Sequence, residues 1–185
     1  MASNSIADAE LLALLREPHS QEQGFRLLMR AHQERLYWHV RRMVGQHDDA
    51  DDVLQSTFIR AWRNIANFKG EAKLFTWLYR IATNESITFL NKKKTKVTFS
   101  MDDDATIDWN DTLPAATPLL DNAEITAKLE AAIATLPEKQ RIVFCMRYYD
   151  EIPYKEMSET LGTTEGALKA SYHHALKKVE LFLVT

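Results

Sequence analysis

The chain has 185 residues, of which 45% are hydrophobic and 26% are charged, a composition that excludes a disordered or fibrous protein and suits one medium or two small domains. No apolar run approaches the roughly 20 residues that span a membrane, and the N-terminus lacks the basic and then apolar order of a signal peptide, so we expect a cytoplasmic protein without membrane insertion. The formal net charge of −3 is unusual for a nucleic-acid binder but is unevenly distributed, since residues 1–94 carry 14 Lys/Arg against 11 Asp/Glu.

The first half of the chain is predicted to form three helices. Apolar residues recur at helical spacings from Gln21 to Gly45, which indicates a core-facing helix. A second helix is expected to begin near His47, because the aspartates within residues 48–52 place negative charge at the positive end of the helix dipole. A glycine-containing break at 67–71 precedes a third helix at about 73–94. The buried stripe of the second helix is expected to be Ala50, Val53, Thr57, Ala61 and Ile65.

The second predicted helix carries a polar row opposite its buried stripe. Ile59 interrupts this row, and an exposed apolar side chain among polar ones suggests contact with another protein. Scattered surface residues are the alternative interpretation, since single exposed apolar side chains are common. The row consists of Asp52, Gln55, Ser56, Ile59 and Arg63.

Aromatic and cationic side chains are interleaved around the start of the third predicted helix. Rings stack on unpaired bases, and cations and amides bond to their edges, so this segment is a candidate site for single-stranded nucleic acid. Packing in the core is the alternative for aromatic residues at helical spacing. The residues expected to face outward or to line the preceding loop are Phe68, Lys69, Phe75, Tyr79, Arg80 and Asn84. Those expected in the core are Trp77, Leu78, Ile81 and Ala82.

Residues 95–120 are predicted to be an acidic linker. They show no sustained period, contain Pro114 and Pro118, and carry one Lys against five Asp. A solvated spacer is the simplest function for such a segment.

Helical periodicity resumes after Asp121, where four short helices fit residues 121–185. They are expected at about 121–135, 137–149, 153–161 and 164–183, with turns that permit only neighbouring helices. The single cysteine, Cys145, stands among apolar neighbours and is expected to be buried and structural.

The last two predicted helices form a candidate helix-turn-helix. Gly162 allows the first helix to end in a left-handed conformation, and Thr163 or Thr164 can cap the second. Leu168, Tyr172, Leu176 and Val179 are expected to face inward. The expected outward row, which would lie in the major groove, is Glu165, Lys169, His173 and Lys177. The alternative is a helical hairpin with a solvated face that never contacts DNA.

Several strings of the sequence together resemble one family. Segments 49–62, 68–71 and 76–84 are similar to region two of the extracytoplasmic-function sigma factors, a branch of the sigma-70 RNA polymerase subunits. Segments 136–141 and 154–157, with the helix from Glu165 onward, are similar to region four of the same family. The resemblance implies an all-α fold of two small helical domains, at 1–94 and 121–185, joined by the acidic linker at 95–120.

The resemblance also implies partners and site residues. The protein is expected to bind core RNA polymerase, to direct it to promoter DNA and to help open the duplex. The core-polymerase site would be Asp52, Gln55, Ser56, Ile59 and Arg63; the minus-ten site Lys69, Phe75, Tyr79, Arg80 and Asn84; and the minus-thirty-five site Arg147, Lys169, Ala170, His173 and His174. The linker of such proteins threads toward the polymerase active site and the RNA exit path, where acidic residues such as Asp102 to Asp104 would imitate RNA.

The sequence departs from the family pattern in two places, one in the core-polymerase site and one in the recognition helix. Ser56 stands where the family usually has Glu, and the recognition helix is poorer in Arg than is usual. Many family members are restrained by an anti-sigma factor, but no residue here identifies one.

Two other classes of protein compete with this interpretation. A conventional helix-turn-helix regulator with a helical sensor or dimerisation domain would explain the C-terminal helices but not the N-terminal strings. An enzyme is disfavoured, because the His47 to Asp52 cluster points in several directions on a helix and no Walker loop or nucleophile motif is present. We therefore expect no catalytic residue, no cofactor and no metal.

Overall fold

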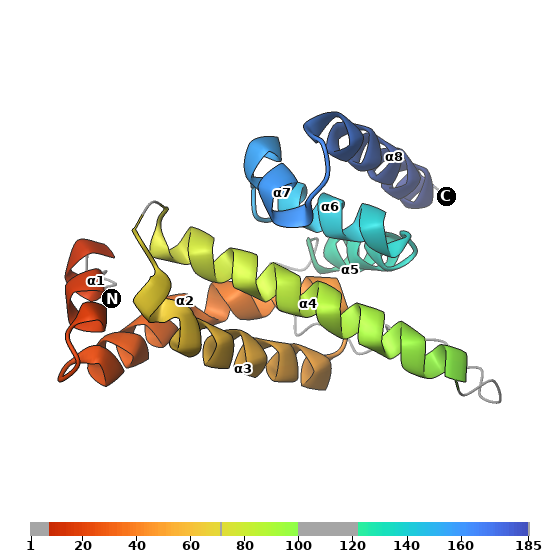
Figure 1. The fold of residues 1–185 in the computed structure, drawn as a ribbon. Helices are drawn as coiled ribbons and strands as arrows, with labels where there is room; N and C mark the ends of the chain where they lie inside the picture. The colour runs from red at the N-terminus through yellow and green to blue at the C-terminus, as the bar shows by residue number, and fades with distance from the viewer. Residues whose placement is uncertain (1–7, 71, 100–121, 185) are drawn as a thin grey trace. The chain divides into compact units, whose positions relative to one another are not determined.

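The computed structural model describes residues 8–70, 72–99 and 122–184, and within these ranges the regular elements are helices (Figure 1). They are α1 (Asp8–Arg16), α2 (Gln21–Val44), α3 (His47–Asn64), the 3-10 turn η1 (Ile65–Asn67), α4 (Leu74–Phe99), α5 (Asn122–Ala134), α6 (Glu138–Tyr148), α7 (Tyr154–Leu161) and α8 (Glu165–Val184). Contacts between Cα atoms divide the chain into two compact units, built on α1 to α4 and on α5 to α8. The predicted all-α fold with two domains is confirmed.

Two predicted boundaries differ from the structure. Helix α1 was not predicted, and α4 extends to Phe99, beyond its predicted end at about residue 94, so residues 95–99 are helical. Residues 94–99 contain no glycine or proline, so nothing in them stops the helix. The remainder of the predicted linker, 100–120, lies outside the described residues.

The core of the first unit lies between α2, α3 and α4. The predicted stripe of α3 is confirmed, since Ala50, Val53, Thr57, Ala61 and Ile65 are all buried. It packs with buried leucines of α2 and α4, which are Leu28, Leu36, Leu74, Leu78 and Leu90. Trp77 and Ile81 were expected in this core but are only half-buried, because they lie at its edge.

Helix α1 packs tightly on α2. Its leucines at positions 11 and 15 are one turn apart and both buried. Gly24 of α2 makes the approach possible, because an added Cβ there would lie 2.9 Å from Leu14 Cβ. The connection is closed by Ser20 Oγ, which donates to the Leu14 carbonyl at 3.0 Å.

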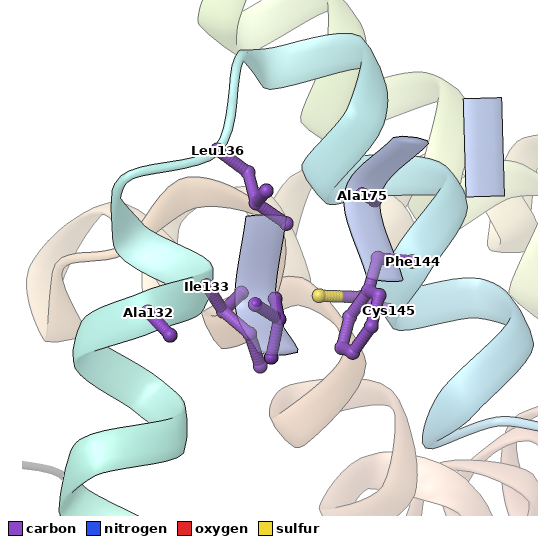
Figure 2. Close-up of a cluster of buried hydrophobic side chains, with 7 residues drawn as sticks. Ala132, Ile133, Leu136, Phe144, Cys145 and Ala175 are labelled. Carbon is purple, nitrogen blue, oxygen red and sulfur yellow. The ribbon is translucent and has the colours of Figure 1, made fainter. Parts of the chain in front are cut away.

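The second unit surrounds a smaller apolar core, shown in Figure 2. It contains Ala132, Ile133, Leu136, Phe144, Cys145, Ala175 and Val179, contributed by α5, α6, α8 and the turn after α5. The Cys145 thiol is fully buried, as predicted. The α5 to α8 boundaries agree with the predicted ones to within about a residue, because each helix here is delimited by a local turn signal.

The turn between α7 and α8 has the predicted geometry. Gly162 adopts φ 61°, which is the left-handed conformation that ends α7. Thr164 Oγ1 then accepts a hydrogen bond from the Ala167 amide at 3.3 Å and caps α8. Leu168 and Val179 are buried, whereas Tyr172 and Leu176 are half-buried at the edge of the core. The outward row of Glu165, Lys169, His173 and Lys177 is exposed.

Candidate functional site

A groove of about 630 Å³ lies between α2 and α3. It is lined by Phe25, Met29, Gln33, Asp51, Leu54, Gln55, Phe58, Ile59, Trp62 and Arg63. Three members of the predicted polar row, Gln55, Ile59 and Arg63, therefore line this groove. Asp52 and Ser56 are exposed on α3 but do not line it.

The bottom of the groove is aromatic. The Phe25 ring meets the Trp62 ring edge to face at 5.0 Å and the Phe58 ring at 6.4 Å. Ile59 and Trp62 nevertheless remain 47% and 41% exposed. An exposed apolar centre with a polar rim is the usual anatomy of a protein-binding surface.

The α2 half of this groove was not predicted from the sequence. Phe25 and Met29 fit a core stripe equally well, so only the packing of α2 on α3 reveals their position. The position of Trp62 could have been predicted from the sequence, because it follows Ile59 by three residues and therefore lies on the same helix face.

Tyr79 does not lie where the sequence analysis placed it. It was expected to face outward or to line a loop, but its side chain is 3% exposed, and its ring lies 4.0 Å from the buried ring of His39. Tyr79 follows buried Leu78 and precedes buried Ala82 by three residues, so it shares the inward face of α4. The interpretation of Tyr79 as an outward-facing residue was therefore wrong.

The pair of His39 and Tyr79 is fixed by hydrogen bonds. Thr83 Oγ1 donates to the Tyr79 carbonyl at 2.9 Å, and His39 Nε2 lies 2.9 Å from the same hydroxyl oxygen. Since the hydroxyl has one hydrogen, the imidazole Nε2–H is the donor to Thr83. The His39–Thr83 hydrogen bond and the packing of the Tyr79 ring on His39 thus join α4 to α2 below the candidate surface.

Phe75 is half-buried and held by cationic and aromatic neighbours. The Arg35 guanidinium lies 4.0 Å from its ring centroid, and the His32 ring lies 5.5 Å from it. Burial lowers the pKa of His32, an effect that Asp8 opposes and Arg35 reinforces. The neutral imidazole is therefore favoured beside this ring.

The other predicted residues of this surface remain accessible. Lys69 and Asn84 are exposed, and Arg80 is half-buried one turn before Asn84 on the same face of α4. Thr88 extends this row by a further turn, and its hydroxyl donates to the Asn84 carbonyl at 2.8 Å. Phe68, which precedes Lys69, packs against the Trp77 ring at 5.1 Å.

In the second unit, four predicted residues share the exposed face of one helix. Lys169, Ala170, His173 and His174 all lie on α8 with exposed side chains. The Lys169 ammonium lies 3.7 Å from the Glu165 carboxylate one turn earlier, so part of its charge is compensated. This face suits a groove of duplex DNA but carries little positive charge.

Arg147 reaches the same end of α8 from α6. Its Nη1 donates to the carbonyls of Ile152 and Glu151 at 3.3 and 3.5 Å, and Glu151 has a left-handed φ of 54°. The Tyr154 ring lies 5.3 Å from the Arg147 guanidinium and 5.6 Å from the Lys169 ammonium. Tyr154, which sequence reasoning did not select, therefore brings the two predicted cations together.

Neither a metal site nor a spanning helix is found in the described parts of the chain. No cluster of three or more His, Cys, Asp or Glu side chains is placed to hold a metal ion there. Asp49, from the acidic cluster at the start of α3, is instead paired with Lys93 at 2.7 Å. None of the described helices is long and apolar enough to cross a membrane.

Two family models match the chain, one in each unit. The model of sigma-70 region 2 matches residues 28–96, and the model of sigma-70 region 4 matches residues 126–179. The first match covers the α4 surface and the residues that line the groove except Phe25, and the second covers the exposed face of α8.

Similar proteins are found among curated sequences and solved structures. The chain is 31% identical to the ECF RNA polymerase sigma factor SigW of Bacillus subtilis, over 85% of this chain and 89% of that protein. It is 26% identical to the ECF RNA polymerase sigma-E factor of Haemophilus influenzae, over 89% of this chain and 90% of that protein. The sigma factor RpoE of Bartonella quintana, solved in complex with the anti-sigma factor NepR, has a similar fold, with a TM-score of 0.71 at 22% identity over 89% of this chain and 96% of that one.

Proposed function

This chain belongs to the extracytoplasmic-function (ECF) sigma factors of RNA polymerase, and from that premise we propose which of its surfaces bind core polymerase and which bind promoter DNA. It is a DNA-binding factor of transcription initiation that directs promoter recognition with RNA polymerase, and it is not an enzyme. We assign polymerase and minus-ten binding to residues 1–94, and minus-thirty-five binding to residues 121–185. The work of such a factor is done in the cytoplasm, where the bacterial polymerase and chromosome meet.

The α2–α3 groove is our candidate for the core-polymerase site. The observation that carries this assignment is the exposed pair of Ile59 and Trp62 above the Phe25 ring. Such a pair would be desolvated at the centre of an interface, where aromatic side chains contribute most of the binding energy. Gln55 and Arg63 would form its polar rim, with Asp52 and Ser56 further along α3.

The start of α4 and the loop before it are our candidate for the minus-ten site. Lys69, Arg80 and Asn84 offer cationic and amide groups, and Phe75 offers part of an aromatic ring. A base extruded from the non-template strand would stack or bond here, which would help to hold the duplex open. We propose that Tyr79 supports this surface from below, because its ring packs on His39.

The exposed face of α8 is our candidate for the minus-thirty-five site. Lys169, Ala170, His173 and His174 would enter the major groove, and Arg147 would hold the adjoining turn through its bonds to two carbonyls. Because this face has little net positive charge, we expect weak binding by the second unit alone. Core polymerase would supply much of the affinity.

Two further parts of the proposal concern partners of the bound factor. The acidic segment at 100–120 would occupy a basic path of polymerase that RNA takes later in initiation. An anti-sigma factor is a further expected partner, since the similar fold of RpoE was solved with one.

The core-binding assignment is tested by crosslinking. A photoreactive amino acid at position 59 of the full chain should crosslink to the largest subunit of core polymerase on illumination. The same amino acid at position 125 is the control, since Ile125 is also apolar and is 64% exposed, but lies on α5. Equal crosslinking from both positions, or none from position 59 in a complex active in promoter-dependent run-off transcription, would contradict the assignment.

A further inference from the structure

Helix α1 has no role in the assignments above, and the region 2 match begins only at residue 28. It is nevertheless a fixed part of the first unit. Leu11 and Leu15 are each 3% exposed against α2, and the close approach at Gly24 leaves no space for a side chain. The helix therefore presents its remaining residues in defined positions.

The exposed side of α1 reaches the loop that precedes α4. Figure 1 shows the helix beside this segment, and α1 also contacts η1, from which the loop begins. An added Cβ on Gly70 would lie 3.8 Å from Arg16 Nη2 and 4.0 Å from Leu12 Cδ1. Arg16 and Leu12 are thus immediate neighbours of the loop residue that follows Lys69.

Asp8, at the other end of α1, contacts the end of the same loop. Its Oδ2 accepts a hydrogen bond from the Leu74 amide at 3.4 Å, and Leu74 is the first residue of α4. A carboxylate at this position satisfies a free amide and complements the positive end of the α4 dipole. Asp8 therefore links α1 to the first turn of the candidate minus-ten helix.

The cations around this loop have no acidic partner in the described structure. Arg16, Lys69 and Lys73 are exposed, and none of them forms an ion pair with any described residue. Glu71, the acidic residue of the loop, lies outside the described residues. Unpaired cations at a surface for single-stranded DNA are suited to its phosphates.

We propose that α1 completes the minus-ten site, with Arg16 binding a backbone phosphate of the non-template strand beside the base held at the loop. Asp8 and Leu12 are positioning residues that fix the loop and the start of α4 for this contact. The inference rests on the proposed minus-ten role of the loop and α4. It adds a DNA contact from a helix that the family match does not cover.

The test measures how the complete holoenzyme binds a fluorescent single-stranded oligonucleotide. The oligonucleotide carries the non-template minus-ten sequence of the promoter that gives the strongest run-off transcript. Arg16→Gln should weaken binding about fivefold at low salt and reduce the slope of log K against log salt by about 0.7, as expected for the loss of one phosphate contact on a single strand. Arg16→Lys keeps the charge and should retain most of the affinity.

Two further variants separate the possible results. Arg26→Gln is the matched control, because Arg26 is an exposed arginine of the same unit already paired with Glu22, and it should leave affinity and slope unchanged. Lys69→Gln tests the proposed function itself and should weaken binding. If Lys69→Gln weakens binding while Arg16→Gln matches the unmodified protein, the role of α1 is refuted and the minus-ten assignment stands. If neither variant changes binding, the minus-ten assignment fails, and the role of α1 with it.

Discussion

The two candidate DNA surfaces, on α4 and on α8, differ in how their side chains are supported. On α4, Phe75 lies against Arg35 and His32 of α2, and the Tyr79 beneath it lies against His39 of the same helix. On α8, Ala170, His173 and His174 are exposed on a single helix, and Lys169 lies 5.6 Å from the Tyr154 ring of α7. The α4 surface is thus built by tertiary packing, whereas the α8 surface is built mainly by helix geometry, with Arg147 of α6 and Tyr154 of α7 at one end.

This difference connects structure with the task of each surface. A surface that holds an unstacked base gains from rigid rings, because order that exists before binding is not lost on binding. A helix that reads an intact duplex needs only a straight row of side chains that fits the major groove. We therefore expect substitutions around α4 to change stability and DNA binding together, and substitutions on α8 to change DNA binding alone.

The largest expected effect is that of Tyr79→Ala. Removal of this buried ring should destabilise the first unit by about 3–5 kcal/mol, as for other buried aromatic residues, whereas Tyr79→Phe keeps the ring and should cost about 1 kcal/mol. Urea unfolding followed by tryptophan fluorescence reports on this unit through Trp38, Trp62 and Trp77. His173→Ala on exposed α8 is the control and should stay within about 0.5 kcal/mol. If Tyr79→Ala left stability unchanged but abolished binding of the minus-ten oligonucleotide, Tyr79 would be a direct DNA contact and not a buried supporting residue.

The next effect is that of Lys169→Gln on duplex binding. Loss of one phosphate contact should weaken holoenzyme binding to a minus-thirty-five duplex by on the order of tenfold at low salt and reduce the salt slope by about 0.9. The free energy of unfolding should not change, because the side chain is exposed. Lys178→Gln on the same helix is the comparison, and an equal loss in both variants would show a general charge effect rather than a defined contact.

A smaller effect is expected from Arg35→Gln. The guanidinium lies over the Phe75 ring at 4.0 Å, so its loss should cost about 0.5–1 kcal/mol of stability. Binding of the minus-ten oligonucleotide should weaken by a similar small factor, because Phe75 would be less ordered. Arg30 is an exposed arginine of the same helix, and Arg30→Gln should change neither the stability nor the affinity for the oligonucleotide. If Arg35→Gln altered DNA affinity at unchanged stability, Arg35 would be a direct DNA contact.

The smallest expected effect is the pH dependence that His32 contributes. Burial lowers the pKa of His32 below 6.5 in the folded protein, so the unfolded chain binds the proton more readily. This contribution to stability is complete above pH 6.5 and is lost as the pH falls from there through the lowered pKa. His32→Asn should flatten the unfolding free energy over that window, measured by urea titrations at successive pH values. An unchanged pH dependence in His32→Asn would contradict the role of burial.

The contrast between the two surfaces also explains what could be predicted from the sequence. The exposed row of α8, the left-handed Gly162 and a cap from Thr163 or Thr164 depend on residues a few positions apart, and all three predictions are confirmed, with Thr164 as the cap. Tyr79 was assigned to the wrong face because its environment is made by His39, which is 40 positions earlier in the sequence. Its spacing from Ala82 favours the core, whereas the aromatic and cationic composition of the segment indicates an outward face.

The unpredicted parts of the candidate sites have the same cause. The α2 side of the groove becomes visible only when Phe25 packs on Trp62 of α3. Leu11 and Leu15 of α1 are spaced as on one helix face, but the close packing of this helix on Gly24 of α2 has no sign in the sequence. Sequence periodicity identifies the buried face of a helix, but not its neighbour.

The exposure of the α8 row has a consequence for how this protein can change over evolutionary time. Substitutions at Ala170, His173 and His174 remove no buried contact and therefore cost little folding free energy. Mutations in this row can be sampled singly or together without loss of the folded state, and each new combination presents different groups to the bases. The set of promoters that the protein recognises can thus diverge rapidly between descendants. Substitutions in the packed surface on α4 are limited, because they also reduce folding stability.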